Sequence, residues 1–364
     1  MSTDVTAPAL TLTTPADILA AVPYIVGFHP TDSLVVIGMS GRVGQGEMRV
    51  CARWNLPLPP GSLRPLTGLF ARESITHLVA VGYGTGAHVT PAVDQLRSVA
   101  QRCGVTPCEV LRAHEGRYWS YVCDLTDCCP LDGTPYDVST SPIAAEATVH
   151  GMVALPDRAT LEATIAPHAG PVRLSMRRAT AGAVAAFRVA MATAPDADHF
   201  AHRFVADGLA RVRAAIETTA RGGRVDDDEA ARLGLDLSLI RVRDEAWTLI
   251  DDASRPAHLA LWRDLSRRLE PRFVPPAASL LAMSAWHGDD CVLATIALER
   301  ALAVDPCYSM ANLLMHALQH LLSPTTLRDR MPSPAELDAA MGAPHASWLL
   351  PLTAILDEKD DRLR

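Results

Sequence analysis

The residues of this chain best suited to chemistry are three closely spaced cysteines, Cys123, Cys128 and Cys129. Thiolates are strong zinc ligands and good nucleophiles. Zinc prefers four ligands, and a fourth could come from His114 or His150, but the region has no second Cys-x-x-Cys pair. Adjacent cysteines also fit a tetrahedron poorly. We therefore expect the thiols to pack at the end of a strand and shape the turn after it, with zinc binding and redox use as alternatives.

A second candidate is a glycine run between an apolar segment, residues 77–83, and a helix expected over residues 91–103. Backbone amides at the start of a helix bind small anions. The run lacks the G-x-G-x-x-G spacing of dinucleotide-binding loops and the acidic residue that would hold a ribose. A small anionic ligand and a tight turn therefore both fit it. The residues assigned to this ligand site are Gly82, Tyr83, Gly84, Thr85 and Gly86.

A third candidate is the turn that carries His29, Asp32 and Ser33. These side-chain types are those of a serine hydrolase, but the chain has no G-x-S-x-G nucleophile elbow. We expect His29 to cap the preceding helix, and Asp32 and Ser33 to make turn hydrogen bonds. A contribution of the three residues to a functional pocket is the alternative.

Two patterns in the second half carry weaker signals. His316 and His320 are four residues apart on one helix, but Ala317 stands where the H-E-x-x-H motif has its glutamate, so we expect no metal there. Acidic residues interspersed among the arginines predict salt-bridged faces in preference to an RNA surface, and Arg243 with Asp244 predicts a local ion pair. The recurring arginines are Arg173, Arg177, Arg178, Arg211, Arg213, Arg221 and Arg224.

The elements that would position the first three candidates alternate between strand and helix. A helix capped by Thr14, with proline at its first turn, runs to the Gly-Phe-His-Pro sequence at residues 27–30. Further helices are expected over residues 62–74 and 91–103, and residues 128–142 are expected to form a loop. Strands are expected over residues 33–39, 48–54, 77–83, 108–114 and 117–123. We predict a mixed α/β sheet domain over residues 1–154.

The strand signal disappears after about residue 155, and we predict an α-helical domain over residues 155–330, followed by a helical extension and charged tail over residues 331–364. Small and apolar residues in a helix over residues 291–304, after a Trp-His-Gly-Asp-Asp turn, resemble the second helix of a tetratricopeptide unit. Such helix pairs bind protein partners. An ordinary helical bundle explains the spacing equally well.

Composition excludes several classes of protein. The chain has 364 residues, a hydrophobic fraction of 49% and a formal charge of -8, which indicate folded cores and disfavour nucleic acid as a partner. Lys359, in the charged tail, is its single lysine. Phosphate-binding loops of the GKS/GKT type and Schiff-base or pyridoxal-phosphate enzymes need a lysine, so both classes are excluded.

The location of the protein is predicted from the absence of export and membrane signals. The N-terminal residues carry no basic segment followed by an apolar run, and no window holds eighteen uninterrupted apolar residues. We therefore expect a cytoplasmic protein that does not associate with membranes. In that reducing compartment its eight cysteines are expected to stay free of disulfides.

Several separated blocks together resemble a family of high-GC Gram-positive bacteria defined by a domain of unknown function. The blocks are PADILAAVPYIVGFHPTDSLVV at residues 15–36, CCPLDGTP at residues 128–135, and Leu280-Leu281-Ala282 ahead of Trp286. The resemblance covers about residues 10–325. It implies bacterial origin but no activity, substrate or cofactor. One departure is Asn55, where the family pattern resembles an aspartate, so an essential carboxylate is not expected there.

These patterns favour a non-catalytic binding or scaffold protein without an obligatory cofactor. Its helical half would bind a protein partner, and its α/β half would bind a small anionic ligand. The alternative is a hydrolase or metal-assisted enzyme that uses the His29/Asp32 turn and the Cys123/Cys128/Cys129 cluster.

Overall fold

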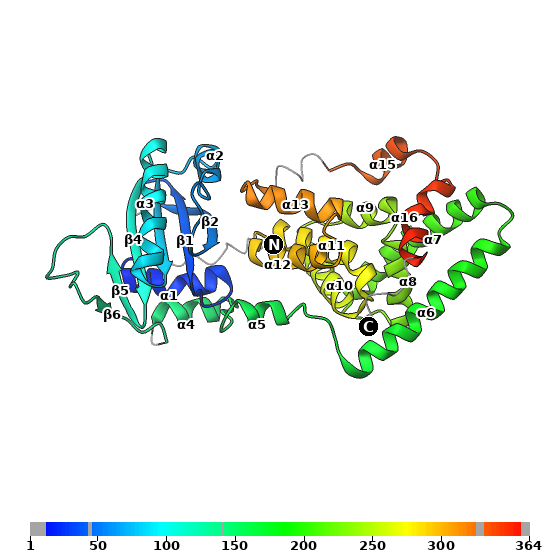
Figure 1. Cartoon of the computed structure of the whole chain (residues 1–364), viewed down its shortest axis with the longest axis horizontal. Coiled ribbons are helices and arrows are strands. Elements are labelled where there is room, and N and C mark those ends of the chain that lie inside the picture. Colours follow the sequence, from blue (N-terminus) through cyan, green and yellow to red (C-terminus); the bar gives the residue numbers. More distant parts are fainter. Residues whose placement is uncertain (1–11, 43–45, 140, 325–330, 358–364) are drawn as a thin grey trace, which may run out of the picture. The chain divides into compact units, whose positions relative to one another are not determined.

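In the computed structural model, which describes residues 12–42, 46–139, 141–324 and 331–357, the chain separates into two units, Met1–Leu161 and Glu162–Arg364 (Figure 1). The first unit combines a six-stranded sheet with helices, and the described residues of the second unit form helices and their connections. The predicted fold class, mixed α/β followed by α-helical, is therefore confirmed.

The sheet of the first unit has the strand order β2-β1-β3-β4-β5-β6. All neighbouring strands are antiparallel except β3 and β4, which are parallel and joined through the helix α3. Every residue of β3 is buried, because the strand is covered on both faces. The strands are β1 Ser33–Ser40, β2 Glu47–Asn55, β3 His77–Tyr83, β4 Thr106–His114, β5 Arg117–Ser120 and β6 Thr134–Pro135.

The helices of the first unit begin and end where local capping chemistry allows. In α1, the Thr14 side chain accepts a hydrogen bond from the backbone of Asp17, whose carboxylate accepts one from the backbone of Thr14; Gly27, with φ 87°, ends the helix. Gly27, and not His29 as predicted, is thus the cap. The helices are α1 Pro15–Val26, α2 Pro65–Arg72, α3 Gly86–Cys103, α4 Pro142–Val149 and α5 Arg158–Ala163, the last of which spans the boundary between the units.

Three differences from the predicted boundaries bear on the candidate sites. The helix α3 begins at Gly86 and not at Pro91, so it contains an interior proline; the packing of Val89 against Gly82 of β3 favours the earlier start. The fifth strand stops at Ser120, so Cys123 lies in a loop and does not end a strand. The expected loop over residues 128–142 contains β6, whose short pairing with β5 carries no hydrophobic alternation.

The second unit is built around α11, of which every residue is buried. It contacts α9, α10, α12 and α13, as the central helix of a bundle does. None of the described helices combines the length and apolar character needed to cross a membrane. The elements are α6 Gly170–Thr193, α7 Ala197–Ala220, α8 Asp227–Asp236, α9 Ile240–Thr248, α10 Arg255–Arg268, η1 Pro271–Phe273, α11 Val274–His287, α12 Cys291–Val304, α13 Ser309–Gln319, α15 Pro334–Met341, η2 Ala346–Leu349 and α16 Leu350–Asp357.

The helix pair predicted from the tetratricopeptide-like pattern is α11 with α12. Ala294, Leu298 and Ala301, the small and apolar residues of that pattern, are fully buried. At the turn between the helices, a Cβ on Gly288 would lie 2.3 Å from Nη1 of Arg255, so a larger residue there would displace the end of the Arg255 side chain. The Asp290 side chain accepts a hydrogen bond from the Leu293 backbone and starts α12.

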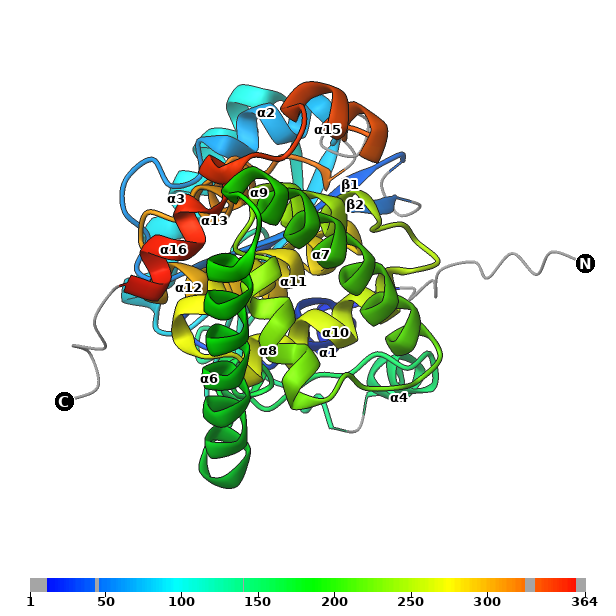
Figure 2. The same ribbon diagram turned by 90° about the vertical axis from the view of Figure 1, so that its right-hand side faces the viewer.

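The long helices α6 and α7 form a hairpin at the edge of the second unit. The chain reverses at Ala194-Pro195, and the Asp196 side chain caps α7 by accepting a hydrogen bond from the backbone of His199. Figure 2 shows α6 running beside α8, against which it packs more extensively than against α7. The two hairpin helices contact each other near their turn through Phe187, Phe200 and Phe204, while α6 packs mainly against α8.

Candidate functional site

The glycine run lies at the carboxyl end of β3, where ligands commonly bind in open α/β sheets. Gly84 has φ 134°, a conformation that favours glycine, and its N–H donates to the carbonyl of Ala113 at 3.0 Å. Thr85 precedes α3 in an extended conformation and makes no side-chain cap hydrogen bond. The first amides of α3 are thus not capped by that side chain.

Two of the five residues assigned to this site serve the core instead. A Cβ on Gly82 would lie 2.3 Å from Cγ1 of Val89, so Gly82 is needed for close packing of α3 on the sheet. The next residue, Tyr83, points to the opposite face of the sheet and is 9% exposed. Burial raises the pKa of Tyr83 well above its usual range. The Tyr83 side chain therefore does not face the loop.

The sheet pairing brings the His29 turn to the glycine run. Ser33 pairs with Tyr83, and Oδ1 of Asp32 lies 3.2 Å from the position of a Cβ on Gly84. The Ser33 hydroxyl is buried and donates to the carbonyl of Thr31 at 2.6 Å. The His29 side chain is exposed, and no hydrogen bond joins the side chains of His29, Asp32 and Ser33 in the described structure. The nucleophile–base contact of a hydrolase is not formed.

A basic group that the sequence analysis missed lies beside the same loop. Nη1 of Arg112 is 3.6 Å from the position of a Cβ on Gly86, at the start of α3. The guanidinium lies 3.6 Å from the ring centroid of Trp119, its neighbour on β5. Among the described residues Arg112 has no carboxylate partner. The alternation of side chains along β4 could have predicted that Arg112 lies near the end of the strand. Its position beside Gly86, however, depends on the pairing of β3 with β4.

The three cysteines gather into one cluster. The Cys123 and Cys128 sulfurs are 3.1 Å apart, those of Cys128 and Cys129 are 3.8 Å apart, and all three lie within 4.8 Å of one another. Hydrogen bonds from its neighbours lower the pKa of Cys123, while the contact with Cys123 raises the pKa of Cys129 to about 12. Cys123 is therefore the first of the three to ionise.

No further side chain completes this cluster in the described part of the chain. His114 and His150, the candidates for a fourth ligand, are not part of the group. His316 and His320 do not form a metal-binding cluster either. Nδ1 of His320 lies 2.9 Å from the carbonyl oxygen of His316, within hydrogen-bond distance, and no third ligand joins the two histidines among the described residues.

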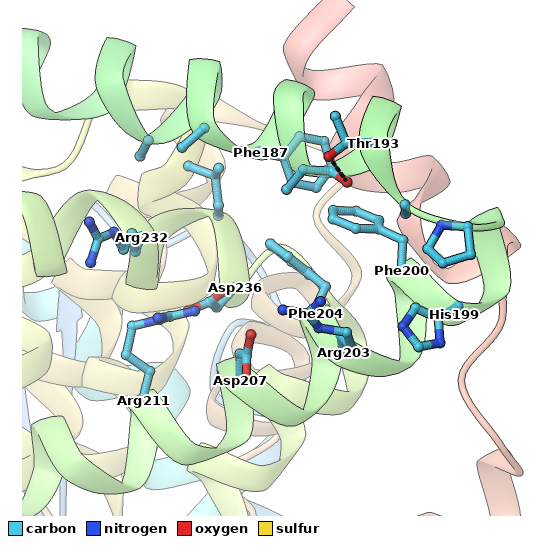
Figure 3. A pocket seen from close by; sticks show the side chains of 16 residues that line it. Phe187, Thr193, His199, Phe200, Arg203, Phe204, Asp207, Arg211, Arg232 and Asp236 are labelled. Atoms are coloured by element: carbon cyan, nitrogen blue, oxygen red, sulfur yellow. Dashed lines mark hydrogen bonds and ion pairs between the residues drawn. The ribbon is translucent and has the colours of Figure 1, made fainter.

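A pocket in the second unit was not predicted. It has a volume of about 470 Å³, within the range of small-molecule sites, and opens between α6, α7 and the end of α8 (Figure 3). One wall is aromatic: Phe187 and Phe200 have ring centroids 5.4 Å apart, and Phe187 and Phe204 5.1 Å apart, both pairs edge to face. Half of the six phenylalanines of the chain thus line one pocket.

The other wall of the pocket is charged. Asp236 is 1% exposed, and Nε of Arg211 donates to its Oδ2 at 2.6 Å. Its Oδ1 is buried without a hydrogen-bond partner among the described residues. Burial raises the pKa of Asp236 to about 6 despite the arginine. Arg203 and Arg232 also line the pocket and have no ion pair in the described structure, so two guanidinium groups remain available there.

The remaining arginines of the second unit mostly form ion pairs. Arg243 pairs with Asp244 at 2.7 Å, which confirms the predicted local ion pair. Glu245, fully buried, accepts hydrogen bonds from Arg213 and Arg241. The other arginines with carboxylate partners include Arg173, Arg177, Arg221 and Arg224. The salt-bridged faces expected from the interspersed charges are thus present.

Sequence comparison adds a family and no activity. The family described as Domain of unknown function (DUF4192) matches residues 15–325. No curated protein and no solved structure matches the chain.

Proposed function

Since the chain belongs to the DUF4192 family, whose description assigns no activity, we propose a function from its own geometry: a non-catalytic protein that binds a small amphipathic anion. The observation that carries the proposal is the pocket between α6, α7 and α8, where an aromatic wall faces guanidinium groups and the partnerless Oδ1 of Asp236. Pockets that bind small molecules commonly combine an apolar lining with a few convergent polar groups.

The aromatic wall supports an apolar ligand body. Phe187 and Phe200 are buried, whereas Phe204 is partly exposed and offers its ring to the space between the helices. The ring contacts keep the three side chains in place before a ligand arrives. Such preorganisation reduces the entropy lost on binding.

The charged wall supports an anionic head group. Three arginines and two aspartates line the pocket, which leaves one positive charge in excess. Arg211 is engaged by Asp236, so Arg203 and Arg232 would bind a carboxylate, sulfonate or phosphate group. The Asp236 Oδ1 would accept a hydrogen bond from a hydroxyl or amide of the ligand.

A direct test uses 8-anilinonaphthalene-1-sulfonate, an aromatic sulfonate, as the probe. We expect saturable binding to one site on the full-length protein. Phe204→Ala and Arg203→Ala should each raise the dissociation constant of the probe about tenfold, which is a loss of about 1.4 kcal/mol of binding free energy. Fluorescence titration and calorimetry would measure both effects.

The matched control is Arg221→Ala, at the C-cap of the same helix α7 but outside the pocket, where Arg221 pairs with the exposed Glu217. It should leave binding unchanged. Circular dichroism melting would show that all variants are folded. The proposal would be contradicted if the wild type and both pocket variants bound the probe equally. It would also be contradicted if neither the probe nor acyl and aryl carboxylates bound saturably.

We propose a second, smaller anion site in the α/β unit, as the glycine run suggested. Arg112, stacked on Trp119 without a carboxylate partner among the described residues, lies at the uncapped start of α3. A guanidinium group and helix-terminal amides together suit a phosphate or carboxylate. The nearby Asp32 carboxylate disfavours a highly charged anion there.

A further inference from the structure

The cysteine loop is held to the sheet at both ends. It starts after β5 and returns to β6, which pairs with β5. Trp119 donates through Nε1 to the carbonyl of Leu131 at 3.0 Å, and Arg117 donates to the carbonyl of Gly133 at 2.6 Å. A Cβ on Gly133, which has φ 81°, would lie 2.5 Å from the Trp119 ring. The return of the loop is therefore fixed by the sheet.

A tight turn inside the loop brings the sulfurs together. The carbonyl of Leu125 accepts hydrogen bonds from the backbone of Cys128 at 3.3 Å and of Cys129 at 2.8 Å. This turn folds the adjacent pair back toward Cys123. Cys128 is exposed, and Cys123 and Cys129 are partly exposed, so an ion can reach all three from solvent.

We propose that Cys123, Cys128 and Cys129 bind one zinc ion through three thiolates, with the fourth position taken by water or an incoming ligand. Four-coordinate zinc with sulfur ligands at about 2.3 Å places those sulfurs about 3.8 Å apart. The Cys128–Cys129 separation of 3.8 Å already matches this value, and the Cys123–Cys128 separation of 3.1 Å would widen slightly. The turn at Leu125 thus overcomes the poor fit expected of adjacent cysteines.

The proton and charge balance of binding is simple. Three S–H bonds break, three zinc–sulfur bonds form, and three protons pass to solvent, with no change in oxidation state. Zinc sites that have three protein ligands and one open position are typical of catalytic centres, whereas structural zinc sites have four protein ligands. We therefore expect an accessible ion that exchanges with chelators.

The test uses Co²⁺ as a spectroscopic substitute for zinc in the reduced, metal-free, full-length protein. We expect one equivalent of Co²⁺ to produce a thiolate-to-cobalt charge-transfer band and intense visible bands typical of a tetrahedral ion. One equivalent of zinc should abolish both, and elemental analysis should find about one zinc per chain.

Cys123→Ser, Cys128→Ser and Cys129→Ser should each weaken zinc affinity by at least about tenfold, because loss of even an outer partner of a ligand costs that much. The matched control is Cys307→Ser, an exposed cysteine of the second unit, which should bind zinc as the wild type does. Absence of the charge-transfer band in reduced wild type would overturn the proposal. So would equal loss of affinity in the control, or conversion of Cys123 and Cys128 to a disulfide with no metal uptake before oxidation.

Discussion

Asp236 shows how a single side chain can be both necessary to a pocket and costly to the fold. Its carboxylate lies at the bottom of the pocket, next to Gly208, where a Cβ would come within 3.3 Å of the Asp236 side chain. Burial raises its pKa from 3.8 to about 6. Between these pH values the folded protein holds a proton that the unfolded chain has released, so the free energy of unfolding falls as pH rises.

Asp236→Asn should remove this pH dependence. Relative to the variant, the wild type should lose about 1–3 kcal/mol of stability between about pH 4.5 and about pH 7, since one pKa unit is worth about 1.4 kcal/mol. Urea unfolding at the two pH values would measure the difference. Glu217→Gln, an exposed carboxylate on α7, is the control. A constant difference between wild type and Asp236→Asn across this range would refute the assignment.

At the scale of elements, the packing of α3 on β3 depends on a glycine, Gly82, which has no side chain. Gly82 lets Val89 approach the strand, and this contact places the start of α3 beside Arg112. A glycine run before a helix indicates anion binding, and on that ground the sequence predicts Gly82 as part of a ligand site. The structure shows that Gly82 serves the packing, while Gly84 provides the turn.

Gly82→Ala should therefore destabilise the protein by about 1–3 kcal/mol through overpacking. Val89→Ala should cost less stability in the Gly82→Ala background than in the wild type, because the two Cγ atoms of Val89 are the nearest to the new methyl group. The control is Gly68→Ala in α2, where an added Cβ meets nothing within 4 Å and should be neutral or slightly stabilising. Thermal melting of the wild type, the two single variants, the double variant and the Gly68→Ala control tests this, and additive effects of Gly82→Ala and Val89→Ala would contradict it.

At the scale of the whole molecule, each proposed site is built within one unit. The amphipathic-anion pocket uses residues 183–236 of the second unit, and the thiol cluster and Arg112 belong to the first. A protein partner for the helical unit stays a prediction. The sites should accordingly function independently of one another.

A fragment of residues 162–364 should bind the naphthalene sulfonate probe within about threefold of the full-length affinity, because the pocket takes no residue from the first unit. Arg112→Ala in the full-length protein should leave probe affinity unchanged while it weakens phosphate binding. Titrations of these three proteins would measure both. Loss of probe binding by a folded fragment would show that the units cooperate.

The sequence alone determined the two fold classes, the capped start of α1, and the helix pair α11–α12. Those features depend on local chemistry: the cap at Thr14, periodic apolar residues, and proline or glycine at the ends. The sequence also pointed to Cys123, Cys128 and Cys129 because they are close along the chain.

Only the tertiary structure placed Arg112 beside Gly86 and assembled the pocket. Arg112 and Gly86 meet because β3 and β4 are parallel, a pairing that no local pattern specifies. Phe187, Phe204 and Asp236 come from three helices, and the contacts between helices depend on side chains far apart in sequence. The turn at Leu125 likewise decided the distances between the sulfurs. Strand order, helix packing and loop conformation minimise the free energy of the whole chain, so local segments do not reveal them.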